Sequence, residues 1–251
     1  MKSSVVRMAR TFKNWPIHYW AKLAKPEYVT YRLRNGIEVR LRANTNDKTV
    51  LKDIWVDDMY SPPGFEIGAT DTVIDIGGHI GVFTLFAAFH ASRGRVYAFE
   101  PMPVNFGMLA ENVRLNGLGN VVARQMGVAA ETTRRPIHIA RRNTGGHSLY
   151  FDEGGAEQLQ VEVISLPDIL REHSLDRVDY LKLDCEGAEH EILRTLPDEI
   201  FATIGKIGME CHDVNDENTC ERMRGYLETK GYQVAVRPED HDRWMIYARR
   251  G

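Results

Sequence analysis

The stretch Val73-Ile-Asp-Ile-Gly-Gly-His-Ile-Gly81 decides the fold of this chain. Its β-branched run, Val73–Ile76, is typical of a buried parallel strand, and a glycine-rich turn follows. Val82–Ala91 predicts an apolar helix whose first turn presents unpaired backbone N–H groups. Arg95–Phe99 predicts a second strand, and Glu100 at its carboxyl end can accept hydrogen bonds from two hydroxyl groups of a ribose. Because glycine also lets a ligand approach the backbone closely, the stretch predicts a cofactor that contains a nucleoside.

The glycine spacing separates the possible cofactors. A dinucleotide fingerprint reads Gly-x-Gly-x-x-Gly, whereas the glycines here are Gly77, Gly78 and Gly81. Asp75 would repel a pyrophosphate but suits the ammonium of an amino acid. The pattern Asp-x-Gly-x-x-x-Gly, with an acid after the second strand, resembles motifs I and II of S-adenosylmethionine-dependent methyltransferases. The alternative is a doubly wound domain whose glycine turn only packs tightly.

Length and composition limit the class of protein. The chain has 251 residues, 43% of them hydrophobic, which is enough for one full core and a small appendage. The net charge of −3 provides no basic field for nucleic acid. Its three cysteines show no C-x-x-C spacing, which argues against a disulfide framework or a zinc cluster. We find neither a transmembrane-length apolar run nor a secretory signal, so we expect a cytoplasmic protein without stable membrane insertion.

The first 26 residues carry six basic side chains and no acid, with Trp15, Tyr19 and Trp20 among them. One interpretation is a segment that binds a membrane surface or a partner. The other, which we favour because the apolar content is low, is a short solvated helix packed by its aromatic face. The oligomeric state stays open, and this aromatic segment offers a contact for a homodimer.

The chain divides into two predicted parts. Tyr28–Leu33 and Glu38–Arg42 alternate around Asn35-Gly36 and predict a hairpin. Asn46–Met59 predicts a helix that Ser61-Pro-Pro-Gly64 ends. We therefore expect residues 1–69 to form an appendage (basic helix, hairpin, helix) that flanks the active site, and residues 70–251 to form an S-adenosylmethionine-binding methyltransferase domain.

From residue 71 onward strands and helices alternate, which predicts an α/β fold with a parallel sheet. The five strands expected in that sheet are Val73–Asp75, Arg95–Phe99, Val121–Arg124, Tyr180–Leu183 and Lys206–Glu210. The first connecting helix is expected to begin at Ile80. The others are expected at Pro103–Leu115, Ala188–Leu196 and Glu217–Lys230. Two short strands are expected at Ile137–Ala140 and Leu159–Val163, and a closing hairpin at Gln233–Val236 and Trp244–Ala248. This order matches the Rossmann-like, seven-stranded class I methyltransferase sheet with a C-terminal antiparallel hairpin, here with a small N-terminal α+β appendage.

Acids follow the fourth and fifth predicted strands. Asp184 and Glu186 come after the fourth, and Glu210 and His212 lie on one side of the fifth if it stays extended. In open α/β sheets ligands bind at the carboxyl ends of the strands, where the strand order reverses. We therefore expect these four side chains to converge near the cofactor sulfonium.

Four segments together resemble one family. They are Asp75–Thr84, Phe99–Pro101 with Asn105, Leu181–Glu189 and Glu210-x-His212. They are similar to FkbM-type O-methyltransferases, over about residues 70–212. The chain departs from this pattern at His79, where relatives often carry asparagine. His79 either touches the methionine carboxylate or the acceptor, or is a turn histidine that faces solvent.

The resemblance implies how the cofactor is held. Asp75 and the Gly77–Gly81 backbone, His79 included, would hold the methionine part, with Asp184 nearby, and Glu100 would take the ribose hydroxyls. The remaining implied contacts are Pro101, Met102, Gly127 and Val128 around the adenine and a hydroxyl contact from Thr84. For Met102, Val128 and Thr84 the alternative is a role in packing alone.

For catalysis, His212 is the predicted base, and Asp184 or Glu210 would orient it or contact the acceptor. The alternative is that His212 is a surface residue. Asp184, Glu210 and His212 also suit Mg²⁺ or Mn²⁺. Metal-dependent relatives, however, usually carry an Asp-Asn or Asp-Asp pair after the fifth strand, so we expect no metal.

The acceptor is predicted to meet Glu186 and a polar loop that contains Arg141, Arg142, His147 and Ser148. The two arginines either hold an anionic acceptor or are solvated loop charges. We expect an O-methyltransferase that acts on a hydroxyl or carboxyl group of a small molecule, sugar or natural product. An N-methyltransferase and a catalytically silent cofactor-binding module are the alternatives.

Overall fold

The computed structural model describes residues 2–139, 148, 157–238 and 243–251. Its main sheet has seven strands in the order β11-β12-β10-β9-β3-β4-β5. In sequence order they are β3 (Thr72–Ile76), β4 (Arg95–Phe99), β5 (Val121–Arg124), β9 (Val178–Leu183), β10 (Ile204–His212), β11 (Tyr232–Pro238) and β12 (Arg243–Arg250). β9, the fourth predicted strand, pairs in parallel with β3, the first, and β10 pairs in parallel with β9. β12 runs antiparallel to both β10 and β11, which confirms the closing hairpin.

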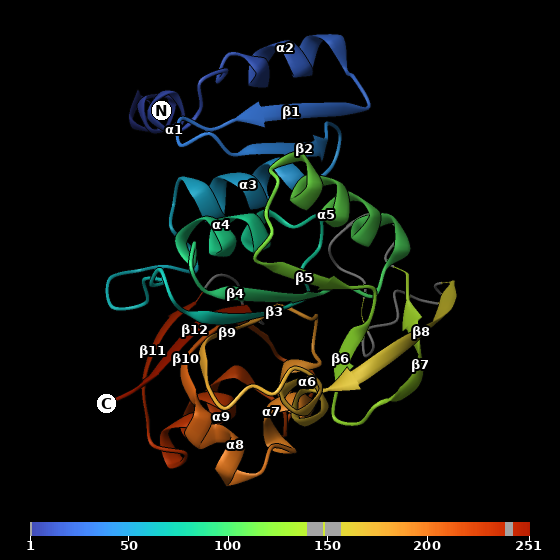
Figure 1. Ribbon diagram of the computed structural model, residues 1–251, viewed down its shortest axis with the longest axis vertical. Coiled ribbons are helices and arrows are strands. Elements are labelled where there is room, and N and C mark those ends of the chain that lie inside the picture. The colour runs from blue at the N-terminus through green and yellow to red at the C-terminus, as the bar shows by residue number, and fades with distance from the viewer. Residues whose placement is uncertain (1, 140–147, 149–156, 239–242) are drawn as a thin grey trace.

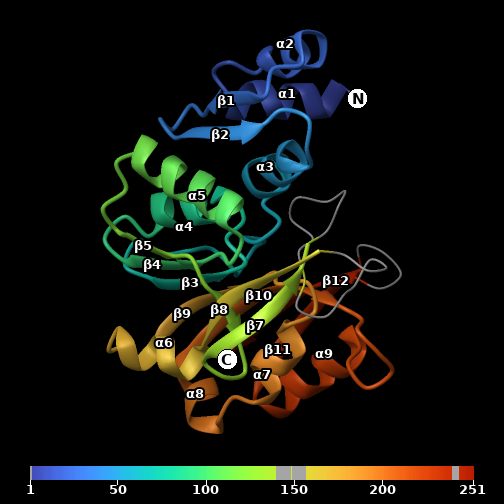
Figure 2. The same cartoon turned by 90° about the vertical axis from the view of Figure 1, so that its right-hand side faces the viewer.

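Helices cover both faces of this sheet (Figures 1 and 2). On one face lie α3 (Asp47–Trp55), α4 (Val82–His90) and α5 (Pro103–Leu115). On the other lie α6 (Leu166–Glu172), α7 (Glu189–Arg194), α8 (Asp198–Thr203) and α9 (Cys220–Thr229). Because both faces are covered, neighbouring residues of the central strands are buried on opposite sides: Val73 and Tyr180 pack in one core cluster, Ile74 and Leu181 in the other. The α/β class I architecture predicted from the sequence is confirmed.

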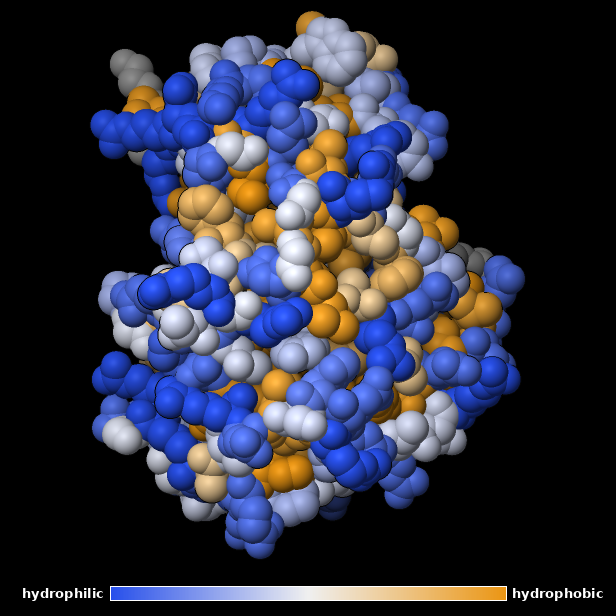
Figure 3. Space-filling view, viewed as in Figure 1, coloured by the Kyte–Doolittle hydropathy of each residue, from blue (hydrophilic) through white to orange (hydrophobic). Residues whose placement is uncertain are grey.

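The N-terminal residues form a separate layer above α3 and α5 (Figure 1). It contains α1 (Lys2–Thr11), α2 (Ile17–Ala24) and the predicted hairpin of β1 (Tyr28–Arg32) and β2 (Glu38–Arg42). Its core is continuous with that of the sheet domain, since Phe12, Leu41 and Phe86 belong to one buried cluster. Figure 3 shows hydrophobic side chains gathered at the level of α3 and α4, between mostly hydrophilic ends.

The N-terminal aromatic residues are only partly packed. Trp15 packs against the core cluster, whereas Tyr19 is 50% exposed and Trp20 is 53% exposed. Packing by an aromatic face is therefore correct for Trp15 but not for the other two. None of the described helices has both the length and the apolar character that crossing a bilayer requires.

A second, three-stranded sheet lies beside the main one, with the order β6-β8-β7 (Figure 1). Its strands are β6 (Gly127–Ala129), β7 (Thr133–His138) and β8 (Gln158–Ser165). The two short strands predicted here were wrong in extent, because β7 begins earlier than Ile137 and β8 continues past Val163. β6 was not predicted, since three residues are too few for a periodic pattern.

The helix ends also differ from the prediction. α3 ends at Trp55 instead of Met59, and Asp58 beyond it has a positive φ of 52°. α9 begins at Cys220 because the side chain of Thr219 accepts a hydrogen bond from the Arg222 N–H. α6 and α8 were not predicted. α6 carries a usable signal, since Ser165 caps it by accepting a hydrogen bond from the Asp168 N–H.

Candidate functional site

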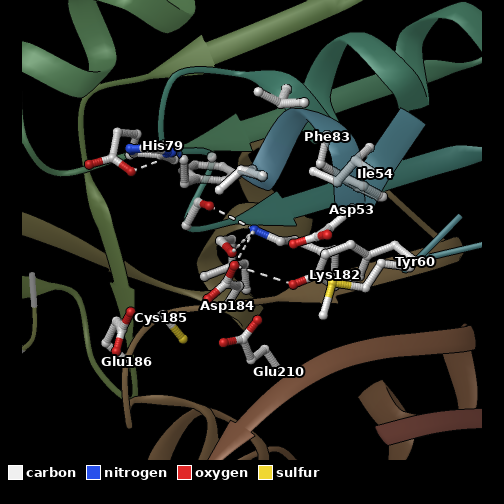
Figure 4. Close-up of a pocket in the computed structure, with 18 of the residues that line it drawn as sticks. Asp53, Ile54, Tyr60, His79, Phe83, Lys182, Asp184, Cys185, Glu186 and Glu210 are labelled. Carbon is white, nitrogen blue, oxygen red and sulfur yellow. Dashed lines mark hydrogen bonds and ion pairs between the residues drawn. The ribbon is translucent and has the colours of Figure 1, made fainter. Parts of the chain in front are cut away.

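A cavity of about 400 Å³ lies at the carboxyl ends of β3, β4, β9 and β10. Strand order reverses between β3 and β9, which is where ligands bind in open α/β sheets. The N-terminal part of the chain also contributes to the wall, through one face of α3 and Tyr60 beyond it (Figure 4). The volume is in the usual range for a small-molecule site.

The glycine turn passes close to two strands. Gly77 has a φ of 77°, and a Cβ built on it would lie 1.7 Å from the backbone oxygen of Asp184. The N–H groups of Gly77 and Gly78 donate to the Phe99 carbonyl at 3.0 and 2.9 Å. Gly77 and Gly78 line the cavity, whereas Gly81 does not and packs against Leu109. Gly77 is therefore required to bring the turn against the end of β9, and the backbone N–H groups of both glycines attach the turn to the end of β4.

Glu100 lies in the cavity wall as predicted. Its carboxylate accepts hydrogen bonds from the backbone N–H groups of His79 at 2.8 Å and Met102 at 2.9 Å. Burial raises the pKa of Glu100 to about 7. Each carboxylate oxygen can accept a further hydrogen bond, so the residue can still receive ribose hydroxyls.

The predicted adenine residues separate into two groups. Pro101, Gly127 and Val128 line the cavity. Met102 does not, and it packs in a small buried cluster with Ile137 and Val163. The packing alternative is therefore the better one for Met102.

Asp75 lies behind the turn and does not line the cavity, so its predicted direct contact with the cofactor is not supported. Its carboxylate accepts a hydrogen bond from the Thr84 hydroxyl at 2.6 Å, and Thr84 is fully buried as well. Asp75 also forms an ion pair with Lys182 Nζ at 3.2 Å. The Asp75 carboxylate, which was expected to bind the ammonium of the cofactor, therefore pairs with the ammonium of Lys182 instead.

Lys182 is the main site residue that was not predicted. Its ammonium donates to the carbonyl oxygens of Gly77 at 2.7 Å and Ile76 at 3.2 Å, and lies 3.7 Å from Asp184. Burial alone would lower the pKa of Lys182, but the carboxylates of Asp75 and Asp184 outweigh it and raise that pKa. A signal was available, since a lysine two residues before Asp184 on a strand lies on the same side as that acid.

The acids after β9 and in β10 converge on the cavity, as predicted (Figure 4). Asp184 accepts a hydrogen bond from the Tyr60 hydroxyl at 3.2 Å, and Glu210 accepts one from Arg243 at 2.8 Å. Burial is the main cause that raises the pKa of Glu210 to about 7 and that of Glu186 to about 8. Two carboxyl groups in this wall therefore titrate near neutral pH.

His212 is placed differently from the prediction. It is not among the residues that line the cavity, and three carboxylates surround its ring: Glu189 at 3.4 Å, Glu186 at 3.5 Å and Glu210 at 3.7 Å. Burial would lower the pKa of His212, but these acids raise it to about 10. The ring is therefore an imidazolium at neutral pH, with no lone pair to accept a proton. The structure thus argues against His212 as the base.

The predicted acceptor loop is only partly described. Arg141, Arg142 and His147 lie outside the described residues. Ser148 is buried, and its hydroxyl donates to the backbone oxygen of Glu186 at 2.5 Å. Ser148 does not line the cavity, so it supports Glu186 from behind.

The N-terminal part of the chain reaches the glycine turn through Arg42. Its guanidinium donates to both carboxylate oxygens of Asp47, at 2.9 and 3.0 Å, and to Nε2 of His79 at 2.8 Å. The side chain of His79 is only 14% exposed and lines the cavity, which excludes the solvent-facing alternative. These contacts link positions far apart in the sequence, and no local pattern predicts them.

Comparisons with known proteins agree with this geometry. The family model described as the Methyltransferase FkbM domain matches residues 75–234. A "Methyltransferase 1" of Beauveria bassiana is 30% identical over 79% of this chain and 88% of its own length. The 31-O-demethyl-FK506 methyltransferase FkbM of Streptomyces tacrolimicus is 30% identical over 74% of this chain and 82% of its own.

Among solved structures, a methyltransferase FkbM from Methylobacillus flagellatus superposes with a TM-score of 0.53 at 20% identity. The match covers 73% of this chain and 44% of the solved one. This likeness supports the fold alone.

Proposed function

This chain belongs to the FkbM methyltransferase family and is an S-adenosylmethionine-dependent methyltransferase, and from that premise we propose that it methylates a hydroxyl group of a small natural-product acceptor. Support for an oxygen acceptor comes from the name of the Streptomyces relative, which acts on a 31-O-demethyl compound. The observation that carries the proposal is the cavity at the β3–β9 reversal, with Glu100 at one end and Asp184 and Glu210 at the other.

The residues of the cavity suit the cofactor. Glu100 would receive the ribose hydroxyls, Pro101 and Val128 would flank the adenine, and the Gly77–Gly78 backbone would contact the methionine part. When bound, S-adenosylmethionine supplies a methyl group on a positively charged sulfur. Asp184, Glu186 and Glu210 place carboxyl oxygens in this part of the wall, which can face the positively charged sulfur.

Glu210 is the base in our proposal, in place of His212. Its carboxylate lines the cavity, and its pKa of about 7 lies near neutral pH, where general bases are most effective. Arg243 donates to one carboxylate oxygen at 2.8 Å and so restricts the side chain. The proton of the acceptor hydroxyl would pass to this carboxylate.

We also propose that the reaction needs no metal. Two cations, Lys182 and Arg243, lie beside the acids of the wall, and His212 behind them is protonated. Over residues 2–139, 148, 157–238 and 243–251, no three His, Cys, Asp or Glu side chains are grouped so as to hold an ion. Methyl transfer that stops with EDTA and returns with Mg²⁺ would contradict this part of the proposal.

Titration calorimetry with S-adenosylhomocysteine tests the cofactor, and a transfer assay tests the reaction. The assay would supply S-adenosylmethionine with a tritiated methyl group and a panel of hydroxylated and amine-bearing small molecules, with mass spectrometry to locate the methyl group. We expect micromolar binding and O-methylated products. Exclusive N-methylation would refute the acceptor atom, and a protein that binds neither cofactor form would refute the enzyme function.

A further inference from the structure

His79 is held in one protonation state by its neighbour Arg42. A guanidinium has donors only, so the 2.8 Å contact between Arg42 Nη2 and His79 Nε2 requires Nε2 to accept. The ring is then neutral and carries its proton on Nδ1. The bidentate pairing of Arg42 with Asp47, which is fully buried, fixes the guanidinium in this orientation.

The Nδ1–H group is available to a ligand. Among the described residues none forms a hydrogen bond with Nδ1, and the His79 ring lines the cavity. The backbone of the same residue is already fixed, because its N–H donates to Glu100 at 2.8 Å. His79 therefore presents one side-chain donor beside the residue that receives the ribose.

The two ends of the cavity wall differ in charge. Asp184, Glu186 and Glu210 bring carboxyl oxygens to one end, which can face a sulfonium or an ammonium. Near His79 the wall includes the polar side chains of Asn46 and Thr49 at the N-terminal end of α3, and the Arg42 guanidinium contacts the His79 ring. A zwitterionic amino acid with a positive sulfur would place its carboxylate at this second end.

We propose that His79 Nδ1–H donates a hydrogen bond to the carboxylate of the cofactor's amino-acid part, and that Arg42 is a positioning residue that keeps the proton on Nδ1. This inference rests on the proposed cofactor. It gives the N-terminal part of the chain a role in cofactor binding, through the Asp47–Arg42–His79 series of hydrogen bonds.

Two matched variants test the contact. His79 has a φ of 50°, which asparagine and aspartate both tolerate, and the two have nearly the same shape. Asparagine keeps a donor, whereas aspartate has none and repels a carboxylate. The ligands are S-adenosylhomocysteine and 5′-methylthioadenosine, which lacks the amino-acid part, and calorimetry measures both.

We expect His79→Asp to weaken S-adenosylhomocysteine binding about 10-fold or more and to leave methylthioadenosine binding within about 2-fold. His79→Asn should keep both affinities within about 3-fold. Parallel losses for the two ligands in His79→Asp, or no loss for either, would overturn the proposed contact. A wild-type protein that binds neither ligand would instead overturn the proposed function.

The positioning role has its own readout, which does not depend on the variants of His79. In ¹⁵N-histidine-labelled protein, long-range ¹H–¹⁵N correlations should show the neutral Nδ1–H tautomer for His79. The Arg42→Met/Asp47→Asn double variant removes the guanidinium without leaving a buried charge. We expect it to show the Nε2–H tautomer as well and to lose affinity for S-adenosylhomocysteine only. An unchanged tautomer would overturn the role of Arg42.

Discussion

The ammonium of Lys182 lies 3.2 Å from the carboxylate of Asp75, and both side chains are buried behind the glycine turn. The same ammonium donates to the carbonyl oxygens of Ile76 and Gly77, so one side chain joins β9 to the end of β3. The turn that carries the predicted cofactor contacts therefore depends on a charge pair whose lysine lines the cavity and whose acid lies behind the wall.

Replacing Lys182 with Met should lower the free energy of unfolding by about 3–5 kcal/mol, because it leaves the Asp75 carboxylate buried without its partner. Urea unfolding followed by circular dichroism measures this. The Asp75→Asn/Lys182→Met double variant removes both charges and should recover part of the loss. If the double variant is no more stable than Lys182→Met, the ion pair is not the cause.

Gly77→Ala should be among the most destabilising single changes in the chain. A Cβ there would meet the Asp184 backbone oxygen at 1.7 Å, and the φ of 77° disfavours any side chain. We expect a loss of at least about 3 kcal/mol from the strained φ and the overpacking together.

Gly225→Ala is the matched control for this substitution. Gly225 lies inside α9 with no heavy atom within 4 Å of a built Cβ, so alanine should stabilise the protein by about 0.5–1 kcal/mol. Thermal unfolding of both variants gives the comparison, and equal midpoints would contradict it.

The features that were predictable from the sequence are those set by short segments. β3 and β4 follow from apolar runs, the β1–β2 hairpin from Asn35-Gly36, and the parallel sheet from the alternation of strands and helices, whereas the order of its strands follows from the match to the class I methyltransferase sheet. The convergence of Asp184 and Glu210 on the cavity follows from their places at the ends of parallel strands.

The features that were missed depend on long-range contacts. Arg42 reaches His79 across 37 positions, and Lys182 reaches Gly77 across 105. The chemistry of His212 was also misjudged for this reason, because a histidine's ability to accept a proton depends on its neighbours. Glu189 lies on α7 and Glu186 in the turn after β9, and both contacts form only when β10 packs beside β9.

His212 should make the free energy of unfolding fall as the pH rises through the alkaline range. Its pKa in the folded protein, about 10, is above its ordinary value of 6.5, so its contribution is complete below about pH 6.5 and is lost as the pH rises toward 10. The wild-type free energy of unfolding should therefore fall between pH 7 and 10, and His212→Gln should flatten this slope.

His90→Gln is the control, since burial lowers the pKa of His90 and that residue contributes no slope in this range. Urea titrations at four pH values between 7 and 10 supply the measurement for all three proteins. A His212→Gln slope as steep as that of the wild type would show that the imidazolium does not persist in the folded state.

Glu210→Gln tests the proposed base. The methyl-transfer rate of the wild type, measured with an acceptor from the screen, should rise with pH through about 7, because only the ionised carboxylate accepts a proton. The amide cannot accept that proton, so kcat should fall roughly 10²–10⁴-fold and the rise with pH should disappear. Arg243 can still donate to the amide oxygen, so calorimetry should find the affinity for S-adenosylhomocysteine within about 3-fold of the wild type.

Because His212 is already protonated at neutral pH, His212→Gln should leave a rise with pH in place. The opposite pattern, in which Glu210→Gln keeps the pH dependence and His212→Gln removes it, would return the role of base to the histidine.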